Sequence, residues 1–552
     1  MRTLCTLLLC SLSLFTCAQP DLDAQAWQED LRFLQHTVHQ DYPFLFKKVT
    51  AEVFDAEVEK FHAAIPGLET HEVIVGFSRI LSLFEYGHTG LRLNAWYKHN
   101  PLNGVQLPFN AVAFKDGIFI QGTHQDYARA LGAKILEVAG TPIETALEAV
   151  KKAFPAENDF YFRAYGLHLL GNPAVLHAQG ITDELRSEIT LKLEKDGKTF
   201  DLSFRGMETD HFPGRYGFIQ QQGEWLDARE QSETPLWLDQ LEKIYYFKYL
   251  PEQKTVYVRQ SQIQDDPSEN IPAFYERVFN FIEENDVEKL VLDVRLNGGG
   301  NNYKNKPVVT GIIRSEKINQ LGKFFVITSG RTFSACQNLV NELHNYTNAI
   351  FIGEPTGENI NFYGDNRLIE LPNSKLSPRL SFAWWQDKPQ WEDGPYLPPQ
   401  IAISQTFAEY QSNEDPVLEA IWSFEGDEGI IISPMTYLEG LFVAGDMEKV
   451  SSEAKRLAKD PRYSYYDFES QFNRAGYNLM GEKQFDAALF VFQLNASIYP
   501  DSPNVWDSLA EGHWKAGKRE KAVELYNKVI AMDPKGPAGT NARRMLKVME
   551  DH

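Results

Sequence analysis

Cysteine is scarce in this 552-residue chain, and most of it lies at one end. Cys5, Cys10 and Cys17 all fall within the N-terminal apolar segment, and only Cys336 lies beyond it. A single remaining thiol cannot form an internal disulfide or a cysteine metal cluster. We expect Cys336 to be a buried, inert thiol, since it falls inside a predicted helix.

Long hydrophobic runs are absent after the N-terminus. Residues 1–18 combine Arg2 with an apolar stretch too short to span a bilayer, which predicts a secretory signal peptide cut before Gln19. The alternative is a lipid anchor at Cys17, but bulky Phe15 precedes it where such signals favour small residues. We therefore expect an exported protein, periplasmic or extracellular, with no membrane span.

Positive charge is in deficit. The chain has 54 lysines and arginines against 76 acidic residues, a net charge of −22. This balance argues against nucleic acid or an anionic membrane as the main partner. The sequence also lacks an H-E-x-x-H metal helix, a phosphate-binding P-loop and a dinucleotide G-x-G-x-x-G. We expect no metal and no cofactor.

The most informative stretch contains three short apolar runs, residues 290–294, 324–328 and 349–353. They are rich in Val, Ile and Phe and are bounded by Gly and Asn turns, which predicts buried strands. Ser334 follows the second run at the head of an apolar-periodic helix, where backbone N–H groups are free. Its hydroxyl could be a nucleophile, or it could simply cap the helix.

A glycine turn ends the first of these runs. Asn297 is followed by Gly298, Gly299 and Gly300, and three residues without a Cβ let the backbone approach a ligand closely. Together with Ser334 this turn could form a nucleophile and an oxyanion hole. The alternative is a parallel α/β layer in which the turn is only structural.

These motifs resemble a known family. VLDVRLNGGG is similar to the D-R-x-N-x-G-G turn, and SGRTFSACQN to the nucleophile turn, of the tail-specific (C-terminal processing) and tricorn-type serine peptidases. IGEPTG resembles the strand that follows, and the similarity covers most of residues 23–404. The resemblance implies a crotonase-like α/β core with Ser334 as nucleophile. It also implies that the N–H groups of Gly298 or Gly299 and of Ala335 stabilise the oxyanion.

A serine nucleophile needs a base. Many tail-specific peptidases use a lysine one strand further on, but this chain has no lysine between Lys323 and Lys375. The resemblance to tricorn-type peptidases implies that the base is His88, which lies in a Gly-His-Thr turn. It also implies that Glu392 orients this histidine, and Asp393 is the alternative acid. Because free histidine titrates near ~6.5, we expect activity to depend on an ionisation near neutral pH.

The remaining sequence suggests several domains. Helical periodicity marks an N-terminal arm, and the phrase at residues 131–140 resembles the strand and turn of PDZ modules, with a helical insertion near 158–180. The predicted division is a signal peptide (1–18), a helical arm (19–100), a PDZ-like module (101–240), a peptidase core (241–410), a helical linker (411–467) and tetratricopeptide repeats (468–552).

The C-terminal prediction is based on a repeat of 34 residues, the tetratricopeptide period. Such helix pairs stack into docking surfaces, so we expect a possible protein partner there. The repeat is too short to be stable alone, and we expect the linker helices to complete the stack. Residues that correspond at this offset are Phe472 and Trp506, Ala488 and Ala522, Phe492 and Tyr526, and Pro500 and Pro534.

The fold class predicted from these patterns is a multidomain α/β protein. Its expected function is that of an exported serine endopeptidase acting on a peptide or protein substrate through Ser334, His88 and Glu392. The alternative is a catalytically inactive protein of the same fold that acts as a binding scaffold through its PDZ-like and tetratricopeptide segments.

Overall fold

The computed structural model describes residues 22–93, 102, 105–208, 214–426 and 429–550. The predicted signal peptide and Cys17 lie outside these residues. The described chain forms two compact units. Unit 1 lies within Met1–Ala113, Gly117–Ala228 and Asn361–Gln386, and unit 2 within Phe114–Asp116, Arg229–Ile360 and Asp387–His552. No helix in these described ranges combines the length and hydropathy of a membrane span.

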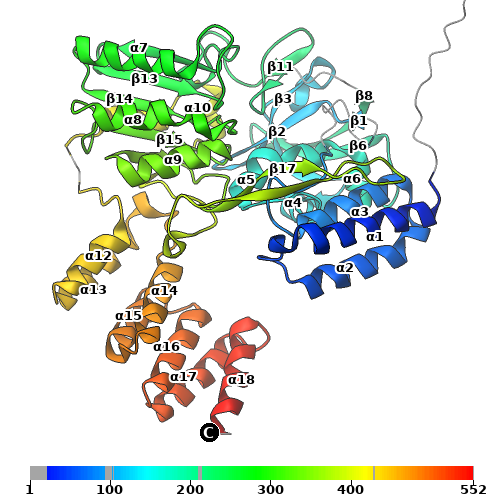
Figure 1. Ribbon diagram of the computed structural model, residues 1–552. Coiled ribbons are helices and arrows are strands. Elements are labelled where there is room, and N and C mark those ends of the chain that lie inside the picture. Colours follow the sequence, from blue (N-terminus) through cyan, green and yellow to red (C-terminus); the bar gives the residue numbers. More distant parts are fainter. Residues whose placement is uncertain (1–21, 94–101, 103–104, 209–213, 427–428, 551–552) are drawn as a thin grey trace, which may run out of the picture. The chain divides into compact units, whose positions relative to one another are not determined.

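Unit 1 begins with the helices that the apolar periodicity predicts. They are α1 (Ala24–Asp41), α2 (Ala51–Ala64) and α3 (Thr70–Ser82), drawn in blue in Figure 1. Asp23 and Thr50 cap the first two, since each side chain accepts a backbone N–H of the first turn. The buried stripe of each helix faces a common core.

A mixed β and helical layer follows in unit 1. Its largest sheet has the strand order β11-β3-β4-β6-β7, with β2 paired to β3 and β5 paired to β4. Three α-helices lie between β5 and β6, and the last two of them fall in the interval 158–180 where the helical insertion is predicted. The bounds are β2 (Phe109–Phe114), β3 (Gly117–His124), β4 (Lys134–Val138), β5 (Thr141–Pro142), α4 (Ile143–Lys151), α5 (Asp159–Tyr165), α6 (Pro173–Ala178), β6 (Glu188–Lys195), β7 (Lys198–Arg205) and β11 (Trp225–Asp227).

Smaller pairs complete unit 1. A long hairpin, β17 (Phe362–Leu368) and β18 (Arg379–Trp385), comes from within the interval predicted for the peptidase core. Leu371, Leu376 and Leu380 of this segment are buried in the same core as helices α1–α3 and the β layer. The predicted arm and PDZ-like module therefore share one core. The two short pairs are β1 (Val105–Gln106) with β8 (Met207–Glu208), and β9 (Gly214–Arg215) with β10 (Phe218–Ile219).

Unit 2 contains a sheet with the order β12-β13-β14-β15-β16-β19. The first two strands are an antiparallel hairpin, and every later neighbour pair is parallel. The three predicted strands are confirmed as β14, β15 and β16. The bounds are β12 (Tyr245–Leu250), β13 (Thr255–Gln260), β14 (Lys289–Asp293), β15 (Phe324–Thr328), β16 (Ile350–Gly353) and β19 (Ile401–Ala402).

Helices cover both faces of this sheet. Alternate strand residues such as Leu292 and Val326 pack with α7 (Ile271–Glu284), α8 (Lys306–Arg314) and α9 (Ala335–Tyr346). The intervening residues, among them Val291, Phe325 and Ile352, pack instead with α11 (Pro416–Ser423). Because successive strand side chains point to opposite faces, this division makes a three-layer α/β/α core. A short helix, α10 (Phe407–Gln411), precedes α11.

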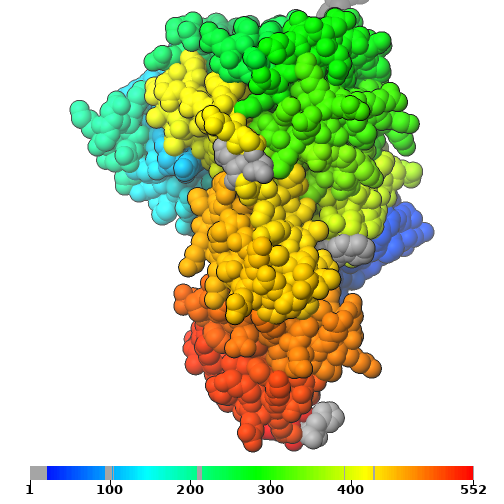
Figure 2. Space-filling view, turned by 90° about the vertical axis from the view of Figure 1, so that its left-hand side faces the viewer, coloured from blue at the N-terminus to red at the C-terminus, as the bar shows by residue number. Residues whose placement is uncertain are grey.

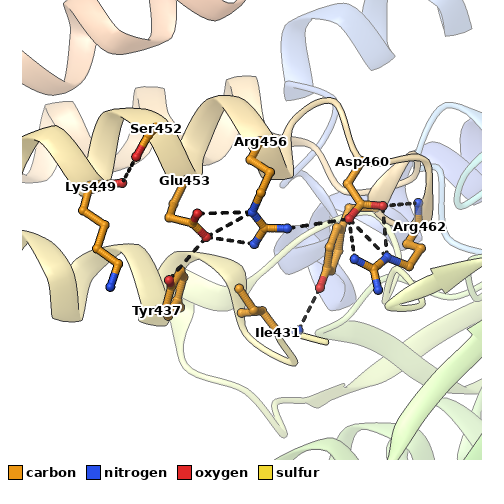
Figure 3. A network of polar contacts seen from close by, with 9 residues as sticks. Ile431, Tyr437, Lys449, Ser452, Glu453, Arg456, Asp460 and Arg462 are labelled. Carbon is orange, nitrogen blue, oxygen red and sulfur yellow. Dashed lines mark hydrogen bonds and ion pairs between the residues drawn. The ribbon is translucent and has the colours of Figure 1, made fainter. Parts of the chain in front are cut away.

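Helices α12 (Pro434–Val443) and α13 (Met447–Leu457) follow. Figure 3 shows the polar contacts beside them: Tyr437 donates to Glu453, which pairs with Arg456, and Asp460 pairs with Arg462. The arginine of each pair stays open to solvent, with Arg456 exposed by 43% and Arg462 by 29%, so each pair stabilises the fold by ~1 kcal/mol or less. Their apolar faces matter more, because Leu438, Val450 and Leu457 share a core with the helices that follow them in the chain. The expectation that the linker helices complete a tetratricopeptide stack stays a prediction.

The chain ends in α14 (Phe468–Gly481), α15 (Phe485–Ile498), α16 (Pro503–Lys515), α17 (Arg519–Met532) and α18 (Pro537–Glu550). Figure 2 shows these helices in orange and red. Ala488 and Ala522, equivalent at the 34-residue offset, are both buried, as are Phe492 and Tyr526. Gly476 has no room for a Cβ, which would lie 2.4 Å from the Phe492 ring.

Candidate active site

Ser334 sits at the junction of a turn and helix α9 in unit 2. Its backbone has φ +58° and ψ −130°, a conformation that L-residues rarely adopt. Its side chain makes no capping hydrogen bond to α9, so the interpretation of Ser334 as a simple helix cap is wrong. Holding a non-glycine residue in such a conformation costs about 1–3 kcal/mol, and such strain concentrates at functional sites.

The glycine turn lies directly against Ser334. A Cβ added to Gly299 would stand 2.6 Å from the Ser334 Cβ and 2.9 Å from the Ala335 nitrogen, and Gly299 has φ +97°. Asn297 fixes the turn: its Nδ2 donates to the Gln260 carbonyl at 3.0 Å, and its carbonyl accepts the Phe333 N–H at 3.1 Å. Only glycine can bring the backbone this close to the serine.

The N–H groups of this region are not equivalent. Gly299 donates its N–H to Asn297 Oδ1 at 2.9 Å, so that donor is already used. Gly298 is exposed, and its N–H has no hydrogen-bond acceptor within the described ranges. Ala335 is the first residue of α9, a position whose N–H has no acceptor in its own helix. Gly298 and Ala335 thus carry the available donors beside Ser334.

A buried acid touches the serine turn. Glu358, 0% exposed, accepts the Ser334 N–H at Oε2 over 3.2 Å. Its turn is tied to the serine turn by a second bond, in which Gly357 donates to the Thr332 carbonyl at 3.0 Å. Glu358 is not among the site residues predicted from the sequence. The signal was present, because Glu358 lies in the turn after β16 in which the resemblance calls for a lysine.

His88 belongs to unit 1, in the turn after α3. The turn is held on both sides: Gly87 donates its N–H to buried Glu157 at 2.6 Å, and the Thr89 and Ser381 hydroxyls are 2.6 Å apart. The imidazole stacks on Phe362, with ring centroids 6.0 Å apart. Burial lowers the pKa of His88 to about 4, below the near-neutral ionisation expected from the sequence. Burial favours the uncharged imidazole, the form that a base requires.

Glu392 lies in unit 2, where it pairs with a buried lysine. Lys388, 3% exposed, donates from Nζ to Glu392 Oε2 at 2.9 Å and contacts His344 Nδ1 at 2.9 Å. Burial, and secondarily the Lys388 charge, lowers the pKa of His344 to about 3. The other predicted acid, Asp393, accepts at its backbone carbonyl from Arg474 at 3.1 Å.

The segment that carries Glu392 is anchored to helix α9. Asn338 and Asn341 of α9 donate to the Asp387 carboxylate at 2.6 and 3.2 Å, and Asn345 donates to the Asp387 carbonyl at 2.9 Å. These three asparagines stand on one face of the helix, at spacings of three and four residues. Helix α9 therefore fixes both the strained turn of Ser334 at its N-terminus and the segment leading to Glu392.

Cys336 follows Ser334 by two positions but faces the core. It is fully buried, and burial raises its pKa well above the usual range of a thiol. A thiol held in its protonated form is a poor nucleophile. This outcome agrees with the prediction that Cys336 is inert.

No family model matches the sequence, and no curated protein matches it. Among solved structures, the chain is similar to mature CPAF complexed with lactacystin (12% identity, TM-score 0.47, 72% of this chain and 97% of that chain). It is also similar to the photosystem II D1 C-terminal processing protease (13% identity, TM-score 0.33, 72% and 96%) and to the tricorn protease (14% identity, TM-score 0.34, 72% and 36%).

These names include a C-terminal processing protease and the tricorn protease, the two kinds of peptidase that the sequence motifs resemble.

Proposed function

We propose that this protein is an exported serine endopeptidase. Ser334 is the nucleophile, His88 the general base and Glu392 the acid that orients the imidazole. The N–H groups of Gly298 and Ala335 stabilise the oxyanion. The substrate is a peptide or protein, and no metal or cofactor takes part.

The observation that best supports this proposal is the strained backbone conformation of Ser334. A serine at φ +58° whose side chain makes no capping bond to its own helix, packed against a glycine at φ +97°, has no evident role in stability. Two N–H donors support the proposal further, because Gly298 in the adjacent glycine turn and Ala335 at the start of α9 could both donate to a tetrahedral oxyanion. A structural turn would be expected to avoid this cost.

The proposed reaction follows from these roles. Ser334 Oγ attacks the peptide carbonyl carbon while His88 removes the hydroxyl proton, and the resulting oxyanion accepts hydrogen bonds from Gly298 and Ala335. His88 then gives its proton to the leaving amine as the C–N bond breaks, which leaves an acyl-enzyme. Water, deprotonated by His88, attacks this ester and releases the second product with Ser334 restored.

The two acids near these groups have different proposed tasks. Glu392 orients His88 and stabilises its protonated form, the role that the sequence predicts for it. Glu358 holds the Ser334 turn, because its carboxylate accepts the Ser334 N–H. Glu358 acts on the position of the nucleophile and needs no contact with substrate.

The other segments have proposed roles as well. Residues 1–18 direct export, residues 101–240 form a PDZ-like module, and the helices after residue 468 are tetratricopeptide repeats that dock a protein partner. The 34-residue offset between buried residues of successive repeats supports the last of these.

Covalent labelling tests the central proposal. A fluorophosphonate reacts with an activated serine, so purified protein should be labelled and Ser334→Ala should not. Ser423→Ala, at an exposed serine at the end of α11, is the matched control and should label like the parent. If the folded parent protein is never labelled, the catalytically inactive scaffold becomes the better description; labelling that persists in Ser334→Ala would move the nucleophile elsewhere.

A further inference from the structure

The C-terminal helices carry a row of polar side chains that the peptidase proposal does not use. Asn473 on α14, Asp507 on α16 and Asn541 on α18 stand 34 positions apart, so they occupy the same place in successive repeats. Tyr477 and Glu511 form a second pair with the same offset. We call these five residues the polar row.

Hydrogen bonds join the row from one repeat to the next. Asn541 Nδ2 donates to Asp507 Oδ2 at 2.7 Å, and the Tyr477 hydroxyl lies 3.1 Å from Glu511 Oε2 and 3.3 Å from the Ser508 hydroxyl. Tyr477 is 37% exposed. The row therefore runs from an accessible phenol and carboxylate to a buried carboxylate beneath them.

Two buried polar atoms at the end of the row formed by Asp507 and Glu511 lack partners among the described residues. Asp507 is 8% exposed, and its Oδ1 accepts no hydrogen bond in the described part of the chain. The hydroxyl of Tyr526 on α17, 0% exposed, is also without a partner among the described residues. Tyr526 lies within electrostatic reach of both Asp507 and Glu511. Native proteins pair nearly all such groups, so two orphaned atoms around one cluster suggest a missing ligand.

The chemistry of the cluster indicates whether that ligand is positively or negatively charged. Its groups are mainly acceptors, with two carboxylates on Asp507 and Glu511. The cation within reach is Arg544, an exposed residue whose guanidinium donates to Asn541 Oδ1 at 2.7 Å. Desolvation, and secondarily the Glu511 charge, raises the pKa of Asp507, so burial of this carboxylate is costly. A bound cation would offset that cost, whereas an anion would add to it.

We propose that the polar row binds a lysine or arginine side chain of an extended peptide segment in a partner protein. The ammonium or guanidinium group lies against Glu511 and displaces the Tyr477 hydroxyl, and its charge is stabilised by Asp507 beneath. The wall of stacked helices holds the rest of the segment, as repeat surfaces of this kind do. This inference does not depend on the peptidase proposal.

Fluorescence anisotropy with labelled hexalysine tests the inference on the full chain. Hexaglutamate is the probe of opposite charge, and both are measured at low and at physiological salt, because a net charge of −22 attracts any cation weakly. The test variant is Asp507→Asn with Glu511→Gln. Its matched control is Asp486→Asn with Glu524→Gln, which removes the same charge from side chains exposed by 100% and 65%.

We expect hexalysine to bind and the test variant to lose at least about tenfold in affinity, while the control changes by less than about twofold. Arg544→Gln removes the competing cation and should strengthen binding, which keeps the proposal testable if the double variant unfolds. Equal losses in test and control variants, or weaker binding in Arg544→Gln, would overturn it. Failure of hexalysine to bind, or equal binding of hexaglutamate, would do the same.

Discussion

The carboxylate of Glu358 accepts the backbone N–H of Ser334 at 3.2 Å, across 24 positions of sequence. Glu358 is fully buried, so this bond forms away from water and is stronger for it. It joins the turn after β16 to the turn before α9. The strained conformation of Ser334 is thus maintained by a neighbouring loop as well as by its own helix.

Variants of Glu358 should show whether its hydrogen bond to Ser334 or its negative charge is what matters. Glu358→Gln keeps an oxygen that can accept the Ser334 N–H, so we expect most of the fluorophosphonate labelling rate to remain. Glu358→Leu removes the acceptor and should slow labelling by roughly a hundredfold, the cost of a misplaced nucleophile. Equal losses in both variants would show that the negative charge, and not the hydrogen bond, is what matters.

Glu392→Gln should behave differently. If Glu392 orients His88, loss of its charge should reduce kcat/KM by up to roughly ten-thousand-fold while the enzyme stays folded. Lys388 would be left buried with a weaker partner, so thermal unfolding must be measured alongside. Asp393→Asn is the matched control at the neighbouring acid. Parent-like kinetics in Glu392→Gln with loss in Asp393→Asn would reassign the role.

Gly299→Ala should damage both stability and labelling. The new Cβ would stand 2.6 Å from the Ser334 Cβ and 2.8 Å from the Phe333 carbonyl, at φ +97°. We expect unfolding in urea to show a loss of roughly 3–5 kcal/mol. Gly517→Ala is the control, because Gly517 has φ +76° but open space around it, and it should lose about 1–2 kcal/mol. Similar losses in the two variants would mean that the turn is not tightly packed on Ser334.

The pH dependence of activity should report the burial of His88. A base must be uncharged, and a pKa of about 4 leaves His88 uncharged throughout the neutral range. We expect kcat/KM to be flat from pH 6 to 8 and to fall only as the pH approaches 4. His88→Ala should lose several orders of magnitude, while Lys323→Ala and Lys375→Ala should change little. A fall in kcat/KM near pH 6.5, or activity that still rises past pH 9, would contradict the assignment of buried His88 as the base.

Stability should fall in mild acid. Burial lowers the pKa of His88 and His168 to about 4 and of His344 to about 3, whereas each titrates near ~6.5 when unfolded. Below pH 6.5 the unfolded chain therefore binds more protons than the folded chain, and each histidine lowers the unfolding free energy by up to ~1.4 kcal/mol per pH unit until its folded pKa is reached.

Urea unfolding of the parent and of His168→Phe between pH 7 and 4.5 measures this effect. The variant removes one of the histidines of unit 1 whose pKa is lowered by burial, so its stability should vary less with pH. An unchanged slope would show that His168 is not held uncharged by the fold. Spectroscopic probes in each unit are needed, because two compact units can unfold separately.

The local sequence pattern was sufficient to predict many of the strands and helices of this protein. The apolar runs predict β14, β15 and β16 because a buried strand needs few residues and clear turn boundaries. The head of α9 places Ser334, and the 34-residue period places the C-terminal helices, since each repeat buries the same positions against its neighbours. These features depend on residues close together in the chain.

The remaining features depend on contacts between residues that are far apart in the chain. Nothing in the sequence sets φ +58° at Ser334 or brings Glu358 to its N–H, because both depend on loops from separate strands meeting at one edge of the sheet. The hairpin of β17 and β18 lies between segments of unit 2 in sequence, yet Leu371 and Leu380 are buried in the core of unit 1. The low pKa of His88 likewise comes from burial, which a turn motif alone cannot specify, because desolvation depends on every group that packs around the imidazole.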